Sequence, residues 1–171
     1  MRLYTIQHQN AWTSAQTSGF LSGNCDFIEP DFIKAYRWMM EEMSKRLKGF
    51  EGEYPVWLWN RKPDLRNTGY LNRGTTGVLL EIVLQKYEVL FSDFMAWHIV
   101  LTNGFLALTE DEDNLFERQC SSVTKEESWK RIFDYEGLRK SDYWKGSNEL
   151  QGVTGKIPLE KITLLKTFIA R

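Results

Sequence analysis

The stretch E-Y-P-V-W-L-W-N-R-K-P-D-L-R, from Glu53 to Arg66, decides how the rest of the chain is interpreted. Residues 56–59 are aromatic, aliphatic or β-branched, and such side chains favour a pleated, half-buried surface. We therefore expect a short strand here. Pro63 disfavours the helical conformation for the residue before it, so the strand should end in an extended turn.

Basic residues follow this strand, and aromatic residues lie within and just before it. The basic residues are Arg61, Lys62 and Arg66, and the aromatic residues are Tyr54, Trp57 and Trp59. Guanidinium groups are fork-shaped donors for phosphate, and flat rings stack on flat bases. The stretch is thus typical of a site for a flat, anionic ligand. The alternative is a core strand followed by solvated charges.

The bulk composition indicates a folded chain without a strong overall charge. At 171 residues it is most simply a single domain over residues 1–171, long enough to bury a sizeable core. A hydrophobic share of 42% excludes a disordered chain. With 22 basic and 23 acidic residues, no whole-molecule field would draw the chain to nucleic acid or to a membrane. An anionic partner would have to meet a local patch.

Cys25 and Cys120 lie far apart and lack metal-ligand spacing, so we expect reduced thiols in a cytoplasmic protein without a metal site. No apolar run approaches the length that spans a bilayer, and no membrane partner is expected. Phosphate-binding loops and nucleophilic triads are also excluded. The G-T-T-G piece lacks the required lysine, and the two histidines have no plausible Ser or Cys partner.

The periodicity of the sequence and its turn residues predict strands and helices in mixed order, which indicates an α+β fold. Strands are expected over residues 2–7, 56–59, 77–84, 85–91 and 146–157. Helices are expected from an Asn10 cap to Gly19, from Pro30 to about Leu47, after Ser92 and Asp93, over residues 126–135, and from Pro158 onward. In the second helix, Arg37 and Trp38 fall outside the apolar stripe. The acidic run T-E-D-E-D-N is expected to be a solvated segment.

Two resemblances follow from the motifs. Over nearly its whole length the chain resembles a family of uncharacterised bacterial proteins with the pieces Y-T-I-Q with A-W, Y-P-x-W with K-P-D-L-R, S-D-F with W-H, and a terminal Q-G strand. More distantly it resembles ADP-ribosyltransferases of the DNA-modifying toxin type. Those proteins carry a first strand Y-H-I-T, an Asn-started helix ending in G-L, and the motif Y-V-P-F-Y-F-x-P-R-x-P-M-L. The matching pieces here are Y-T-I-Q, Asn10, Gly19-Phe20-Leu21 and Y-P-V-W-L-W-N-R-K-P-D-L.

The second resemblance implies an ADP-ribosyltransferase-like fold, with a split mixed or antiparallel sheet and flanking helices, that binds NAD as a substrate. It places the catalytic arginine at Arg61 and the late catalytic acid near Glu149 or Gln151. Further NAD contacts are implied at Thr5, Gln7, Asn10, Tyr54, Trp57, Trp59 and Arg66. Thr5 stands where the family has histidine, and Gln7 is the nearby side chain that can replace its hydrogen bonds.

The expected function is therefore transfer of ADP-ribose to a macromolecule, either nucleic acid or protein. A late glutamate stabilises the oxocarbenium-like transition state electrostatically, and an amide does so less well. Gln151 and Thr5 accordingly keep a second hypothesis open, a catalytically inactive nucleotide- or nucleic-acid-binding module of the same fold.

Overall fold

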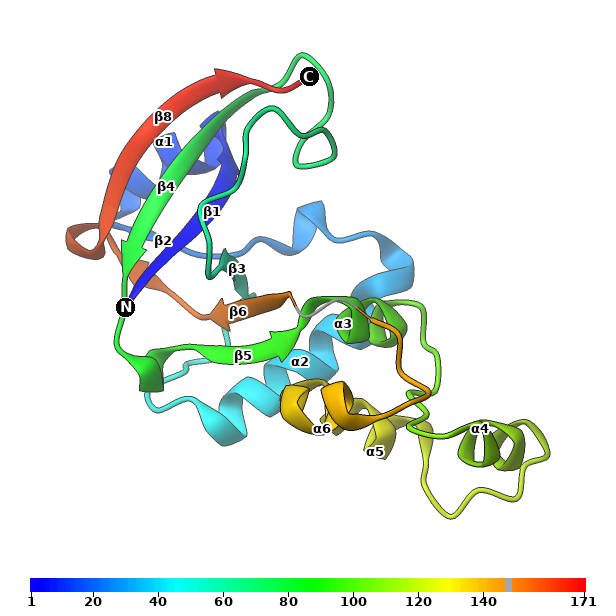
Figure 1. The fold of residues 1–171 in the computed structure, drawn as a ribbon. Coiled ribbons are helices and arrows are strands. Elements are labelled where there is room, and N and C mark those ends of the chain that lie inside the picture. Colours follow the sequence, from blue (N-terminus) through cyan, green and yellow to red (C-terminus); the bar gives the residue numbers. More distant parts are fainter. Residues whose placement is uncertain (147–148) are drawn as a thin grey trace. The chain divides into compact units, whose positions relative to one another are not determined.

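The fold is built on an antiparallel pairing between the first strand and a strand from the middle of the chain. Strand β1 (Arg2–His8) pairs with β4 (Thr76–Val83) in a register that runs from Arg2 opposite Val83 to His8 opposite Gly77. Strand β8 (Ile162–Ile169) pairs with the other side of β4, and β3 (Val56–Trp59) pairs with β1 (Figure 1). The six-stranded sheet has the order β5-β6-β3-β1-β4-β8. Two further strands, β2 (Phe20–Leu21) and β7 (Ile157–Pro158), form a separate antiparallel pair.

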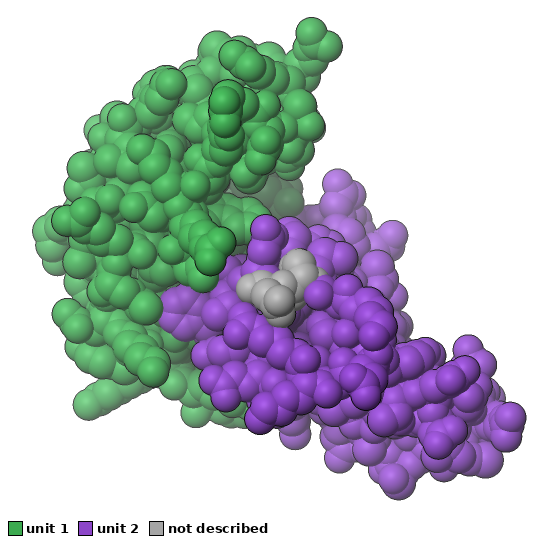
Figure 2. All heavy atoms as spheres, in the orientation of Figure 1, with its two compact units in different colours: residues 1–27, 40–90, 152–171 green, residues 28–39, 91–151 purple. Residues whose placement is uncertain are grey.

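The computed structural model describes residues 1–146 and 149–171. Its contacts divide the chain into two units (Figure 2). Unit 1 comprises residues 1–27, 40–90 and 152–171, and unit 2 comprises residues 28–39 and 91–151. Part of the predicted strand over residues 146–157, namely Ser147 and Asn148, lies outside the described residues.

Helix α1 (Gln9–Ser18) follows β1 directly and buries Trp12 and Ala15. The prediction that Asn10 caps this helix is wrong. The cap is His8, whose ring Nδ1 accepts a hydrogen bond from the Asn10 backbone N–H at 3.1 Å. The predicted end at Gly19 is confirmed: Gly19 has φ +86°, a left-handed conformation that glycine adopts without steric cost.

Helix α2 (Ile33–Arg46) follows two 3-10 turns, Cys25–Phe27 and Pro30–Phe32, so Pro30 opens the turn that leads into it. Its residues 33–39 belong to unit 2 and its residues 40–46 to unit 1. The expectation that Trp38 lies off the packed stripe is wrong. Trp38 is 8% exposed and contacts Trp129 edge-on at 5.4 Å and Phe133 in a stack at 5.8 Å.

The helical elements of unit 2 after residue 91 are short. They are α3 (Phe94–Leu101), α4 (Glu110–Glu117), α5 (Lys125–Trp129), a 3-10 turn (Lys130–Phe133) and α6 (Tyr135–Lys140). The acidic run expected to be a solvated segment forms most of α4. The Thr109 side chain caps this helix by accepting a hydrogen bond from the Glu112 N–H. The positive end of the helix dipole stabilises the carboxylates in the first turn.

Two predictions in the second half of the chain are wrong. Residues 85–91 do not form one strand: a 3-10 turn (Lys86–Glu88) precedes strand β5 (Leu90–Asp93). The helix expected after Pro158 is limited to a 3-10 turn (Leu159–Lys161), and residues 162–169 form β8 instead. The ladder between β4 and β8 shifts register at Leu79/Leu80, as a β-bulge does.

The fold is α+β with a six-stranded antiparallel sheet and several helices, which confirms the predicted class. The expected late strand is present as β6 (Leu150–Thr154). Within the described part of the chain, no helix combines the length and the apolar character needed to cross a membrane.

Candidate functional site

The candidate residues of β1 and β3 project from two opposite faces of the sheet. Tyr4 stands directly opposite Trp59, so their side chains share a face. Side chains alternate along a strand, so Trp57 lies on the same face as Trp59. Thr5 lies on the opposite face. The structure therefore brings Trp57 and Trp59 together and separates them from Thr5.

Thr5 and Gln7 form a polar pair on their face of β1. The Gln7 Nε2 donates a hydrogen bond to the Thr5 Oγ1 at 2.8 Å. Thr5 is only 2% exposed, whereas Gln7 is half-buried. The hydroxyl thus fixes the amide nitrogen, and the amide oxygen of Gln7 remains an acceptor for another group.

The 60–75 loop, which joins β3 to β4, lies on the tryptophan face. The rings of Trp59 and Tyr70 meet edge-on at 6.2 Å. Gly77 pairs with His8, whose side chain lies on the same face as that of Tyr4. A Cβ on Gly77 would lie 2.5 Å from the Cδ1 of Leu71 in this loop. Glycine at this position therefore lets the loop pack closely on the sheet.

The basic residues of the 60–75 loop differ in their surroundings. Arg66 donates from Nη2 to the Asp64 Oδ2 at 2.6 Å, and this bond lowers the pKa of Asp64 to about 2. Arg66 therefore carries its own counter-ion. Arg61 and Lys62 are exposed, and neither forms an ion pair with a described residue. Arg61 is thus the guanidinium of this motif that is open to an external anion.

Tyr54 precedes β3 and is held through its backbone. Its carbonyl accepts the Gly23 N–H at 3.1 Å, and a Cβ on Gly23 would lie 2.7 Å from the same oxygen. The close approach requires glycine at position 23. Asn10 is exposed on the first turn of α1.

Gln151 and Glu149 belong to unit 2, whereas Arg61 belongs to unit 1. Gln151 is 5% exposed, and its Nε2 lies 3.5 Å from the Ser92 Oγ on β5. The Glu149 side chain is exposed, and its backbone carbonyl accepts the Phe94 N–H at 2.9 Å. Of the two late candidates, Gln151 is therefore the one whose side chain is buried.

Sequence reasoning assigned Ser92 and Asp93 only to the start of a helix. Both are in fact nearly fully buried polar residues at the end of β5, and the Ser92 Oγ is the partner of the Gln151 amide. Asp93 caps α3 by accepting the Ala96 N–H at 2.9 Å, and burial raises the pKa of its carboxyl. The signal available in the sequence was the pair of polar residues directly after the apolar end of a strand.

The two units carry opposite net charges. Unit 1 holds 13 basic and 9 acidic residues, and unit 2 holds 9 basic and 14 acidic residues. In the described residues, no group of three or more His, Cys, Asp or Glu side chains is arranged to hold a metal ion. The arginines of unit 1 are therefore the natural contacts for an anionic ligand.

These features define an α+β protein with an exposed arginine after an aromatic strand and a polar pair, Thr5 and Gln7, on the neighbouring strand β1. A family model described as a domain of unknown function, DUF3841, matches residues 2–125, and the chain belongs to this family. The expected membership of an uncharacterised family is thus confirmed. Neither the curated proteins nor the solved structures contain a match to the chain.

Proposed function

We propose that the protein binds NAD and transfers its ADP-ribose to a macromolecular acceptor, as the ADP-ribosyltransferases that it resembles do. The observation that carries this proposal is the sheet order, in which β6, β3 and β1 are consecutive neighbours. These are the three strands that the resemblance assigns to the NAD site. The acceptor is nucleic acid or protein.

Arg61 is the proposed contact for the NAD phosphates. It follows β3, is exposed and has no ion pair with a described residue. Arg66 is less suitable because Asp64 already occupies its guanidinium. A guanidinium without a counter-ion pairs with phosphate through two parallel N–H donors.

Gln7 is the proposed contact for a ribose hydroxyl. Its amide nitrogen is engaged by Thr5, which leaves the amide oxygen to accept a hydroxyl proton. In this proposal Thr5 positions Gln7 and does not itself touch NAD. Trp57 and Trp59 project from the other face of the sheet, so stacking on nicotinamide would be left to another ring, such as the half-buried Tyr54.

A second function, NAD binding without turnover, is favoured by Gln151. A carboxylate stabilises positive charge that develops on the ribose, whereas a neutral amide does so less well. Gln151 is buried and its amide is hydrogen-bonded to Ser92.

Binding is tested by calorimetric titration of NAD into the wild-type protein and Arg61→Gln. Hydrogen bonds to charged groups contribute about 1.5–3 kcal/mol, so the variant should bind roughly 10- to 100-fold more weakly. Arg118→Gln is the matched control, because Arg118 is exposed in unit 2 and forms no ion pair with a described residue. Absence of NAD binding at millimolar concentration, or equal loss in both variants, contradicts the proposal.

Turnover is tested separately by chromatography of released nicotinamide. If the protein is a transferase, wild type releases nicotinamide and Gln151→Ala or Glu149→Ala releases less. If it is a binding module, wild type binds NAD without release, and Gln151→Glu is expected to gain activity because it supplies the carboxylate. Binding without release in both wild type and Gln151→Glu contradicts the assigned role of position 151.

A further inference from the structure

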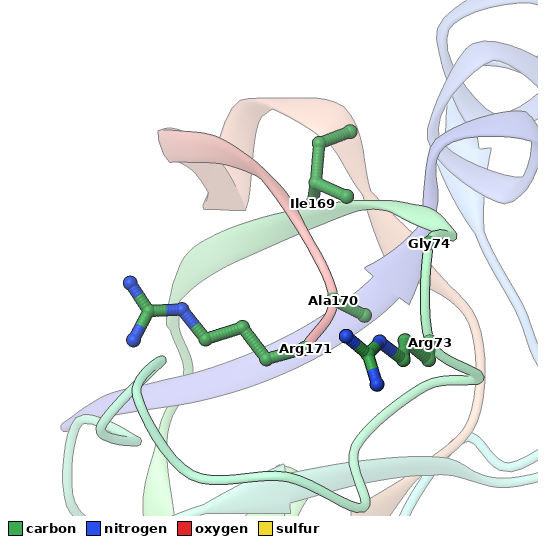
Figure 3. A pocket seen from close by; sticks show the side chains of 5 residues that line it. All are labelled: Arg73, Gly74, Ile169, Ala170 and Arg171. Carbon is green, nitrogen blue, oxygen red and sulfur yellow. The ribbon is translucent and has the colours of Figure 1, made fainter.

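A hollow of about 660 Å³ lies in unit 1 where β8 ends. Its lining residues are Arg73, Gly74, Ile169, Ala170 and Arg171 (Figure 3). The side chains of Arg73 and Arg171 do not converge on a common point (Figure 3), so they do not form a site for one anion. A more specific chemical feature lies in unit 2, at the end of helix α3.

Helix α3 is followed by the only Asn-Gly step of the sequence, Asn103-Gly104, and Asn103 is exposed. The backbone nitrogen that follows an asparagine can attack the side-chain Cγ, and glycine hinders this attack least because it has no side chain. The attack forms an N–Cγ bond and expels the amide nitrogen as ammonia, which leaves a succinimide ring. Water then opens the ring at either carbonyl and gives aspartate or isoaspartate. Asn103 is therefore the most labile asparagine that the sequence contains.

The folded end of α3 engages the nitrogen that would attack. Asn103 has φ +56°, in the left-handed region that asparagine adopts more readily than most residues. Its N–H donates to the Val100 carbonyl at 3.0 Å, and the Gly104 N–H donates to the Ile99 carbonyl at 2.8 Å. These two bonds form the Schellman arrangement of helix C-termini. The Gly104 nitrogen must lose its proton to attack, so its bond to Ile99 has to open first.

The Asn103 side chain is held by a lysine of helix α2. Lys34 Nζ donates to the Asn103 Oδ1 at 3.2 Å and to the Glu126 Oε1 at 2.7 Å. The same Nζ lies 5.3 Å from the centroid of the Trp129 ring. All four residues belong to unit 2. The succinimide ring closes only when side chain and backbone rearrange together, so a hydrogen bond that anchors the side chain opposes the reaction as well.

We propose that Asn103 is a site of spontaneous deamidation, and that the Schellman bonds and Lys34 restrict the reaction to moments when the end of α3 opens. Helix ends open at a lower free energy than the whole fold. Isoaspartate carries the main chain through Cγ and so inserts an extra atom just before Gly104. The Gly104 carbonyl accepts the Nε1–H of the buried Trp129 at 2.7 Å, so this insertion loosens the packing of that ring. The site does not depend on the proposed NAD chemistry.

The test is peptide mapping by mass spectrometry after incubation in mildly alkaline buffer, with the protein either folded or in urea. Asn67, which is exposed in unit 1 and precedes Thr68, is the internal reference. In urea Asn103 should convert faster than Asn67. Folding should lower the ratio of the two rates roughly 10- to 100-fold, since two backbone hydrogen bonds must break. A ratio that folding leaves unchanged, or no conversion of Asn103 in the folded protein after prolonged incubation, overturns the proposal.

Lys34→Gln tests the role of the lysine. An exposed ion pair contributes little, so this variant should convert Asn103 about two- to fivefold faster when folded, with an unchanged rate in urea. Lys140→Gln is the matched control, because Lys140 is exposed in unit 2 and forms no ion pair with a described residue. Equal rates in the two variants contradict the role of Lys34.

Asn103→Gly tests the consequence for Trp129. Glycine adopts the left-handed φ and removes the reactive amide, so the tryptophan fluorescence of this variant should stay constant during incubation while that of the wild-type protein changes. The change should follow the appearance of isoaspartate, which is measured by enzymatic methylation. Equal changes in both proteins, or isoaspartate at Asn103 without a change in fluorescence, contradict the predicted effect on Trp129.

Discussion

The ion pair between Arg131 and Glu112 is predicted to be a main contribution to the stability of unit 2. Arg131 Nη1 donates to the Glu112 Oε2 at 2.8 Å and to the Leu106 carbonyl at 2.5 Å, while its Nη2 donates to the Glu112 Oε1. The Glu112 Oε2 also accepts the Leu108 N–H at 2.8 Å. One pair of side chains thus links α4, the 106–108 segment and the 3-10 turn after α5.

Removal of one partner from a buried pair costs about 3–5 kcal/mol, because it leaves an uncompensated charge. The two side chains are 20% and 22% exposed, so water will compensate part of this loss. We therefore expect Arg131→Gln to lower the free energy of unfolding by about 2–3 kcal/mol. For a chain of this size that corresponds to roughly 4–12 °C in Tm.

The assay is urea unfolding followed by tryptophan fluorescence, since Trp129 and Trp38 are buried in unit 2. Arg131→Gln, Glu112→Gln and the double variant form a double-mutant cycle, with an expected coupling of about 1–2 kcal/mol at pH 7. Glu112→Gln is a matched change because its amide oxygen still accepts the Leu108 N–H.

The coupling should depend on pH in a defined direction. The Arg131 hydrogen bonds lower the pKa of Glu112 below its usual 4.5. A carboxyl whose pKa is lowered by folding contributes stability above its unfolded pKa and loses that contribution as the pH falls through its folded pKa. The coupling should therefore be complete at pH 7 and disappear on acidification below the usual pKa. A coupling near zero at pH 7, or one that is unchanged at acid pH, would refute this reasoning.

Three further predictions concern local structure. Strand β8 is an edge strand of the six-stranded sheet, and Lys166 is its only charged residue. A charge on an edge strand opposes pairing with another chain. Lys166→Ile should therefore increase association measured by light scattering, whereas Lys166→Glu should not. Gly19→Ala should cost about 1 kcal/mol in thermal unfolding, because no atom blocks the added methyl group and only the φ of +86° opposes it; an unchanged Tm would contradict this. Asp93→Ala should cost about 1 kcal/mol more than Asp93→Asn, which keeps the cap acceptor. Burial raises the pKa of Asp93, so the wild-type protein should lose stability as the pH rises through that pKa. Asp93→Asn should not show this loss. The pH profiles of the free energy of unfolding of the two proteins test this difference.

Local signals were sufficient where one residue type decides the conformation. Gly19 ended α1 as predicted because its left-handed φ favours glycine, and Asp93 capped α3 as predicted because a short acidic side chain reaches the helix N–H groups. The strand over residues 56–59 was also predictable, because its aromatic and β-branched residues fit a pleated surface.

The last strand shows where a local pattern fails. Ile162, Leu165 and Phe168 recur near the helical period, which predicted a helix. The segment instead pairs with β4, more than 70 residues earlier in the chain. Its several β-branched residues suit that pairing, but the partner strand is a tertiary choice that periodicity does not report.

The candidate site was predictable in its residue types and not in its geometry. Arg61, which the motif singled out, is exposed and forms no ion pair with a described residue, but the motif alone does not report that exposure. The placement of Thr5 and Trp59 on opposite faces follows from the register of Tyr4 with Trp59, and a one-residue shift would have reversed it. Trp38 was misjudged for a similar reason, because its partners Trp129 and Phe133 come from a distant segment.

The division of charge between the units has a consequence for how the molecule meets other ions. Its formal net charge of −1 is the small difference between a cationic part and an anionic part of comparable strength. A polyanion approaching residues of unit 1 and a polycation approaching residues of unit 2 would each find attraction, and added salt would weaken both. The isoelectric point reflects only the net charge, so it does not reveal that one unit is cationic and the other is anionic.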